Sequence, residues 1–376
     1  MLLKGSGRLL YRIGFVLQLC SFRYCPQKNQ YVVHRFVYYH IFLSLLKVLL
    51  LGFDIPLLIL IFYGLYSAKL VDNITVILIV GQIVLWLSRL YGLVALICLT
   101  HVPYYQEKIL QLLNAILHID KELENCFLDE NSTKQKSGAL VLLFVVTVLR
   151  FASDLHSTFG RVVHLVAALY YNTLLHLCYL AVALYLVKLM EWRRDLSLFM
   201  TEFMECLQED DCYFGNQNER LICCLRLNFA ITQLQGSFYA IFNTFSFVIP
   251  LLILNFVCLW DFALISHFLS IFLLGFLSDK VKKKENEFLN QLVDIDLHLN
   301  RKNIKEPKEY RCMAFLTILN QHFNCAKDPY HRILSRKYAL YLITSFLIYF
   351  ITYWFGIFMN NNRFSFLRKM NITLVS

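Results

Sequence analysis

The sequence predicts an all-α membrane protein with seven transmembrane helices, a cytosolic N-terminus, an extracellular C-terminus and long cytosolic helical extensions. Of its 376 residues, 58% are hydrophobic and 16% are charged, whereas soluble domains carry roughly 25% charged residues. Apolar runs that are long enough to cross a hydrocarbon core of about 30 Å recur along the chain. Basic residues gather in alternate segments between these runs, which is the bias that orients membrane proteins.

The first 40 residues form a cytosolic N-terminal segment that carries six basic residues and no acidic one. Residues 41–277 hold transmembrane helices one to six, of which the first two are expected at 41–65 and 74–96. Asp54 and Pro56 interrupt the first span, and the proline is expected to bend its helix.

A polar cytosolic loop is expected at 101–138. Within it, apolar residues recur at helical spacing, which predicts an amphipathic helix outside the bilayer. These residues are Ile109, Leu112, Leu113, Ile116 and Leu123.

The third and fourth spans are expected at 139–158 and 162–189. Arg150 and Asp154 lie inside the third span, four residues apart, so that they share a helix face and can pair. A second polar cytosolic loop, 190–235, leads to the fifth span at 237–258, which contains Pro250, and to the sixth at 262–277.

The cytosolic segment 278–337 opens with the basic run KVKKK. It then places Phe288, Leu292, Ile295 and Leu299 at alternating steps of four and three, the spacing of a helix that packs on another helix. The seventh span, 338–359, has 22 uncharged residues and many aromatic ones, and an extracellular tail, 360–376, follows it.

The distribution of basic residues indicates which side of the membrane the N-terminus faces. With a cytosolic N-terminus, the inner segments hold 28 lysines and arginines and the outer ones hold 5, which favours this arrangement. It is opposite to that of a G-protein-coupled receptor. Glycosylation sequons begin at Asn73 and Asn371 on the outside and at Asn131 on the inside, and such triplets are frequent by chance.

Motifs for enzymatic chemistry are absent: there is no Walker loop, dinucleotide fingerprint, HExxH or nucleophile elbow. The twelve cysteines include no CxxC pair, so we expect reduced thiols and no metal site. We therefore expect no enzyme, no cofactor and no nucleic-acid partner. A G-protein-coupled receptor and a secondary transporter remain alternatives, although no internal repeat of the kind that transporters show is evident.

The end of the last span carries a recognisable motif. Thr352 and Tyr353, followed by the five residues WFGIF, resemble the TYhhhhhQF motif that closes the last helix of insect gustatory receptors, a family related to insect odorant receptors. Chain length, seven spans, orientation, long inner loops and a short tail are also similar to that family. Met359 and Asn360 stand where the family has Gln and Phe, which puts the properties of the pore in question.

This resemblance implies a ligand-gated, non-selective cation channel in the plasma membrane of chemosensory neurons, on their dendrites. The channel would be a homo- or hetero-tetramer with related receptor subunits, surrounded by membrane lipids, and would detect a small-molecule tastant. Large, divergent branches of the family detect bitter or other non-sugar compounds. The inner loops would form a cytosolic anchor domain from the packed helices at 109–123 and 288–299.

The resemblance also implies where the sites lie. The last helix of each subunit would line the pore, through Thr352, Tyr353, Phe355, Gly356 and Met359. The outer halves of earlier spans would enclose the tastant, through Arg150, Asp154, His156, His164, Tyr170, Tyr171, Asn172, Phe247, Asn255, Trp260 and His267. Aromatic walls with a few polar groups suit a small, partly apolar ligand. The alternatives are interfacial or packing aromatics, a structural ion pair between Arg150 and Asp154, and packing histidines.

Overall fold

The computed structural model describes residues 22–33, 103–126, 138–158, 162–208, 214–246, 262–301 and 308–327. It also describes isolated helical residues in the first and last predicted spans, namely Leu45, Leu49, Ile59, Tyr63, Leu340, Thr344, Leu347, Ile348, Ile351 and Phe355.

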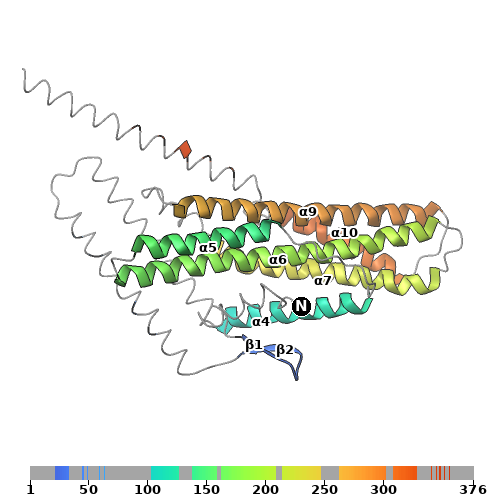
Figure 1. Cartoon of the computed structure of the whole chain (residues 1–376). Helices are drawn as coiled ribbons and strands as arrows, with labels where there is room; N and C mark the ends of the chain where they lie inside the picture. Colours follow the sequence, from blue (N-terminus) through green and yellow to red (C-terminus); the bar gives the residue numbers. More distant parts are fainter. Residues whose placement is uncertain are drawn as a thin grey trace, which may run out of the picture.

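Within this part of the chain the fold is mostly helical. The long helices lie side by side in an elongated bundle (Figure 1), in which α6 packs along α9 and α5 packs on both of them. Helix α7 contacts α4, α6 and α10. The helices are α4 (Pro103–Cys126), α5 (Gly138–Thr158), α6 (Val162–Gln208), α7 (Phe214–Ser246), α9 (Phe262–Arg301) and α10 (Lys308–Lys327).

Two short strands in the N-terminal segment, β1 (Phe22–Cys25) and β2 (Gln30–Val33), form an antiparallel hairpin. Asn29 in its turn has a φ of 48°, a left-handed conformation that asparagine tolerates. The strands were not predicted, because four-residue strands give too short a run of alternation to register in a sequence.

The hairpin is held on α4 by Asn114. The backbone N–H of Tyr31 donates to Asn114 Oδ1 at 2.7 Å, and Asn114 Nδ2 donates to the Tyr31 carbonyl oxygen at 3.3 Å. One side-chain amide therefore satisfies both backbone groups of an edge residue, as a neighbouring strand would. Phe22 of β1 and Tyr31 of β2 are both buried.

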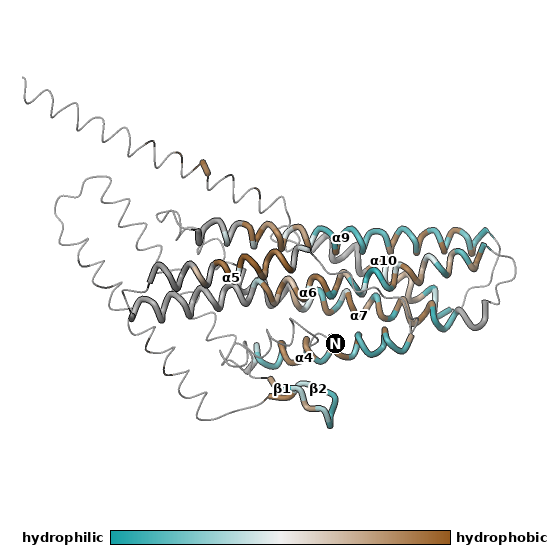
Figure 2. The backbone as a smooth tube through the Cα atoms, in the orientation of Figure 1, coloured by the Kyte–Doolittle hydropathy of each residue, from teal (hydrophilic) through white to brown (hydrophobic). Residues whose placement is uncertain are grey.

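Helices α6 and α9 continue well beyond the apolar runs in which they begin. Figure 2 shows the change from hydrophobic to hydrophilic along α9. Neither continuation, 190–208 or 278–301, contains glycine or proline, so nothing breaks the helix when the sequence becomes polar. Much of the predicted loop 190–235 is therefore helical, in α6 and α7.

The predicted helix-packing seam is confirmed: Phe288, Leu292, Ile295 and Leu299 of α9 are all buried. The amphipathic helix predicted within 101–138 is confirmed as α4, which buries Ile116, Ile119 and Leu123.

Helix α5 shows two apolar faces. Leu143 and Val146 are buried, whereas Val141, Leu142, Phe144, Val145, Val148 and Leu149 are 42% to 55% exposed. Among the residues that the structure describes, no helix has both the length and the hydropathy required of a membrane span.

Candidate functional site

The residues predicted to bind a ligand fall mainly on three helices that contact one another. Arg150, Asp154 and His156 lie on α5, His164, Tyr170, Tyr171 and Asn172 lie on the first part of α6, and His267 lies near the start of α9. The end of α5 and the beginnings of α6 and α9 gather at one end of the bundle (Figure 1). The structure describes the backbone of these residues and not their side chains, and Phe247, Asn255 and Trp260 lie outside the described residues.

Of the predicted pore residues, the structure describes Phe355. It is helical and 63% exposed. Thr352, Tyr353, Gly356 and Met359 lie outside the described residues.

The most polar part of the described interior is the middle of α6, where Arg193 is buried with 1% of its surface exposed. Its Nη1 donates to Oδ1 of Asn228, and its Nη2 donates to Oγ1 of Thr232 at 2.8 Å and to Oε1 of Gln235 at 3.5 Å. These three acceptors lie on α7. Nη2 also lies 3.5 Å from Oε1 of Glu285 on α9. We call these five residues the Arg193 cluster.

The acceptors on α7 are arranged by helix geometry. Asn228, Thr232 and Gln235 are four and three residues apart, so they lie on one face of α7. The hydroxyl of Thr232 donates to the carbonyl oxygen of Asn228 at 2.9 Å. Its proton is thus directed along α7, and its oxygen is left to accept from Arg193.

A second polar contact joins α6 to α4. Asp120 is buried and accepts from Nε1 of Trp192 at 2.7 Å, while Nζ of Lys188 lies 2.8 Å from the same oxygen. Burial by itself raises the pKa of Asp120, but the Lys188 ammonium and the Trp192 hydrogen bond outweigh it and hold that pKa below its usual range.

A third contact joins α6 to α9 one turn further along. Ser197 donates to Oε1 of Gln291 at 2.8 Å, and Nε2 of Gln291 donates to Oγ1 of Thr201 at 2.8 Å. The amide of Gln291 is thereby fixed between two hydroxyls of α6. The segment 188–201 of α6 is therefore bonded to α4, α7 and α9.

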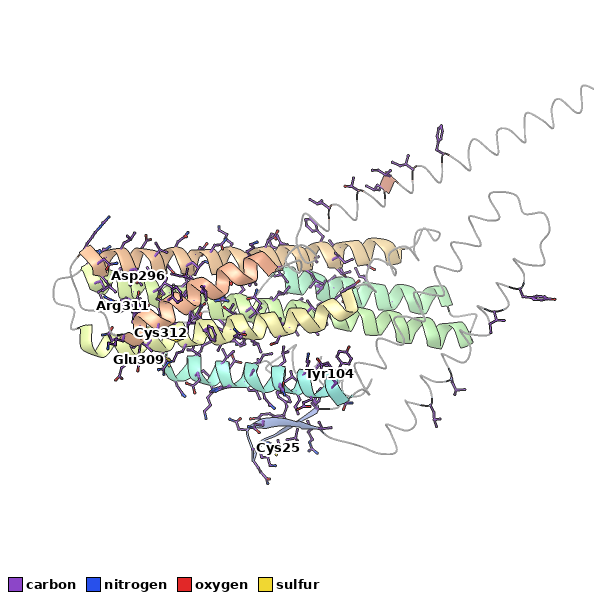
Figure 3. The ribbon with its side chains drawn as sticks, turned by 180° about the vertical axis from the view of Figure 1, so that it is seen from behind. Cys25, Tyr104, Asp296, Glu309, Arg311 and Cys312 are labelled. Carbon is purple, nitrogen blue, oxygen red and sulfur yellow. The ribbon has the colours of Figure 1, made fainter. Side chains whose placement is uncertain are left out.

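Helix α10 joins this arrangement through α9 and α7. Tyr310 donates to Oδ1 of Asp296 at 2.5 Å, and Arg226 of α7 lies 3.5 Å from Glu309. Figure 3 shows Glu309, Arg311 and Cys312 on the first turns of α10, near Asp296. The outer face of α10 carries Phe315, which is 62% exposed, and Leu319.

The polar groups described above join neighbouring helices to one another. Among the described side chains, no three His, Cys, Asp or Glu residues are grouped to hold a metal ion. The pKa of Cys223 is raised to about 12 by burial and by the neighbouring Cys126 thiol, so this thiol is a weak nucleophile.

The Arg193 cluster was not predicted from the sequence, because its members lie on three helices and 35 to 92 residues separate Arg193 from its partners. One signal was present, namely the helical spacing of Asn228, Thr232 and Gln235. The low hydropathy of this stretch instead favours a polar loop.

In fold, the chain is similar to the structure of the insect olfactory receptor OR5 from Machilis hrabei. The TM-score is 0.54, 13% of the residues are identical, and the alignment covers 92% of this chain and 97% of that chain. The structure of the same receptor in complex with eugenol gives a TM-score of 0.53 at 14% identity and the same coverage. No protein-family model and no curated protein matches the sequence. The chain therefore has the fold of an insect olfactory receptor, and this fold agrees with the resemblance to the related gustatory receptors.

Proposed function

We propose that this chain is a chemosensory receptor subunit that forms a ligand-gated, non-selective cation channel and detects a small-molecule tastant. The observation that carries the proposal is the fold shared with an insect olfactory receptor over nearly the whole length of both chains. The motif of the last span, Thr352-Tyr353 followed by WFGIF, supports a gustatory rather than an olfactory role. A bitter or other non-sugar compound is the proposed stimulus.

The ligand site is proposed where α5, α6 and α9 meet, among the predicted residues on those helices. The olfactory receptor OR5, which has a similar fold, is in complex with eugenol in one of its structures. Eugenol is a small, largely apolar phenol. Tyr170, Tyr171 and Asn172 on α6 offer the combination of aromatic surface and polar groups that such a molecule requires.

The proposed setting is the plasma membrane, with seven spans and an outside C-terminus. The broad apolar face of α5, with Val141, Val145 and Val148 exposed, supports contact with lipid, because large apolar surfaces are rarely left in water. The distribution of basic residues supports the orientation.

The proposed assembly is a tetramer of this chain or of this chain with related subunits. Phe315 and Leu319 form an apolar strip on α10 next to the exposed Cys312. Such an exposed apolar strip supports contact with a second subunit.

The pore is proposed to be lined by the last helix of each subunit. If Met359 faces the axis, Phe355 lies one turn below it on the same side. Rings of these two residues would make an apolar constriction that closes by losing its water.

The function is tested by recording from cells that express the chain with and without related receptor subunits, while G-protein cycling is blocked. A panel of bitter and other small organic compounds, including eugenol, is applied. We expect ligand-evoked single-channel events. Ligand-dependent uptake without such events would identify a transporter instead, and a response that vanishes when G proteins are blocked would identify a G-protein-coupled receptor. A tag after Ser376 that is accessible on intact cells separately excludes the latter.

The assembly is tested through Cys312, which is exposed on α10. Mild oxidation of membranes is expected to yield disulfide-linked dimers, because a strip that faces the central axis of a cyclic tetramer brings its copies from the other subunits close together. Cys312→Ser removes the product, while Cys25→Ser on the β1–β2 hairpin leaves it unchanged. A monomer in detergent, with no cross-linked product, would contradict the tetramer.

A further inference from the structure

The partners of Arg193 are unequal in charge and in distance. The close ones are neutral, namely the side chains of Asn228 and Thr232 on α7, the latter at 2.8 Å. The charged partner, Glu285 on α9, lies at 3.5 Å. A buried guanidinium and carboxylate attract each other more strongly as they approach and as water is excluded, so the strongest available pairing is not fully made in this arrangement.

A small displacement of α9 would change whether Arg193 is held more strongly by α7 or by α9. If α9 moved by less than 1 Å relative to α6, Glu285 would come within normal hydrogen-bonding distance of Arg193. The side chains on α7 tolerate such a change, because Asn228, Thr232 and Gln235 can each donate as well as accept a hydrogen bond. Two arrangements of the cluster are therefore available, one held on α7 and one held on α9.

The cluster lies between the two regions that a ligand-gated channel must connect. Arg193 is 21 residues after Asn172 on the continuous helix α6, a distance of roughly 32 Å along the axis. Glu285 follows His267 on α9, and the same helix is bonded through Asp296 to Tyr310 of α10. In the sequence, α10 directly precedes the proposed pore helix.

We propose that Arg193 is a positioning residue that exchanges between the polar side chains of α7 and Glu285 of α9 and thereby sets the equilibrium between two states of the receptor. The inference rests on the proposed channel function for its electrical test. In the described structure Arg193 is held mainly on α7. A change that moves the guanidinium toward α7 or toward α9 shifts the equilibrium between the two states of the receptor. The two helices compete for the guanidinium, so strengthening one side has the opposite effect to strengthening the other.

The test uses near-isosteric variants that bias the exchange in both directions. Glu285→Gln weakens the α9 side, and Asn228→Asp strengthens the α7 side, so both favour the arrangement held on α7. Thr232→Val weakens the α7 side. Arg193 itself is left in place, because its removal would leave its buried partners unpaired.

The expected result is a pair of opposite shifts. Glu285→Gln and Asn228→Asp should move the half-maximal ligand concentration and the unliganded current in one direction, by roughly fivefold. Thr232→Val should move both in the other, and the double variant Glu285→Gln with Thr232→Val should return toward the original values. Glu287→Gln is the matched control, since Glu287 pairs with Lys283 and Lys284 of its own helix.

Shifts of all three single variants in the same direction, or no shift among variants that reach the surface in normal amounts, would overturn the exchange. If the unaltered protein carries no current, the proposed function fails and the exchange is still tested by hydrogen exchange in detergent. Glu285→Gln and Asn228→Asp should slow exchange in α7 and speed it in the second half of α9, and Thr232→Val should do the reverse. Uniformly faster exchange in all variants would show that the cluster only stabilises the fold.

Discussion

The two ends of the helical bundle are built in opposite ways. Around α5, the described exposed side chains include a broad apolar face, and the buried ones, Leu143 and Val146, are also apolar. At the other end, the surface of α10 and of the second half of α9 mixes polar residues with exposed apolar ones such as Val293, Leu297 and Phe315, and the interior contains the charged residues Arg193 and Glu285. The described side chains of α5 are therefore mainly apolar both outside and inside, whereas the other end has a mixed surface and charged residues at selected points inside.

This difference teaches that the two ends depend on different forces. At the polar end, burial of Phe288 and Leu292 removes apolar surface from water and supplies the main stabilisation, while the Arg193 cluster fixes how the helices meet. At the apolar end, if α5 faces lipid as proposed, the helix gains little from burying one more aliphatic group, and close contact between helices holds the structure. Substitutions that look alike should thus have different effects at the two ends.

The largest effect is expected from Arg193→Met. It removes the charge from a buried site and leaves Glu285 and three polar side chains without their partner, at a cost of about 3–5 kcal/mol of stability. The thermal unfolding midpoint of the detergent-solubilised protein should fall steeply. The control is Arg226→Met, which breaks an exposed ion pair with Glu309 and should change the midpoint little.

A lysine on the α5 face should have the next largest effect. Val145→Lys is expected to reduce the amount of membrane-inserted protein, because a lysine within a span costs about 2.5–3.5 kcal/mol. Leu198→Lys on the polar part of α6 is the control, since Leu198 is 54% exposed and its replacement should leave insertion unchanged. If both variants insert equally well, the α5 face lies in water and the contrast between the two ends is lost.

A smaller effect is expected from Asp120→Asn, which should cost roughly 1–3 kcal/mol. Because the pKa of Asp120 is lowered in the folded state, its carboxylate stabilises the fold at pH values above the usual pKa of a free carboxyl, and this contribution is lost as the pH falls through the lowered pKa. The unfolding midpoints of the original and Asp120→Asn proteins should therefore differ at pH 7 and converge in acid. The control is Glu122→Gln on the same helix, whose side chain is 41% exposed and whose replacement should change the midpoint little at pH 7.

The smallest effect, and of opposite sign, is expected from Asp195→Asn. Burial raises the pKa of Asp195, and Arg194 only partly opposes this, so the ionised form is disfavoured in the folded state. Above the usual pKa, ionisation costs stability, and this cost disappears as the pH falls below it. Asp195→Asn should raise the unfolding midpoint slightly at pH 7 and leave it unchanged in acid. A clear loss at pH 7 would mean that the contact with Arg194 dominates.

Periodicity predicted the parts of the fold that repeat along one helix. The seam from Phe288 to Leu299 and the buried face of α4 both followed from the spacing of apolar residues, because that spacing is local. The ends of α6 and α9 did not follow, since hydropathy marks where a lipid environment would end and not where a helix ends. The Arg193 cluster depends on three helices meeting, which no single stretch of sequence records.

The candidate ligand and pore sites were likewise predictable only in part. Their residues were predicted from the resemblance, and the structure brings the backbones of α5, α6 and α9 together at one end. The pore residues, of which Phe355 is described, and the ligand residues stay predictions. The exposed strip of Phe315 and Leu319 on α10 was not predicted, because a pattern of apolar residues does not distinguish a buried face from one that is open to a second subunit.

The joint between the β1–β2 hairpin and α4 has a consequence for how the sequences of chains with this fold diverge. Asn114 binds the N–H and C=O of Tyr31, groups that every residue except proline carries. The two hydrogen bonds of this joint thus depend on the main chain at position 31 and not on the side chain there. As long as Asn114, an apolar residue under the hairpin and a turn residue that tolerates the positive φ of Asn29 are kept, the other hairpin positions can vary, and hairpins from distant relatives should be exchangeable on the same helix.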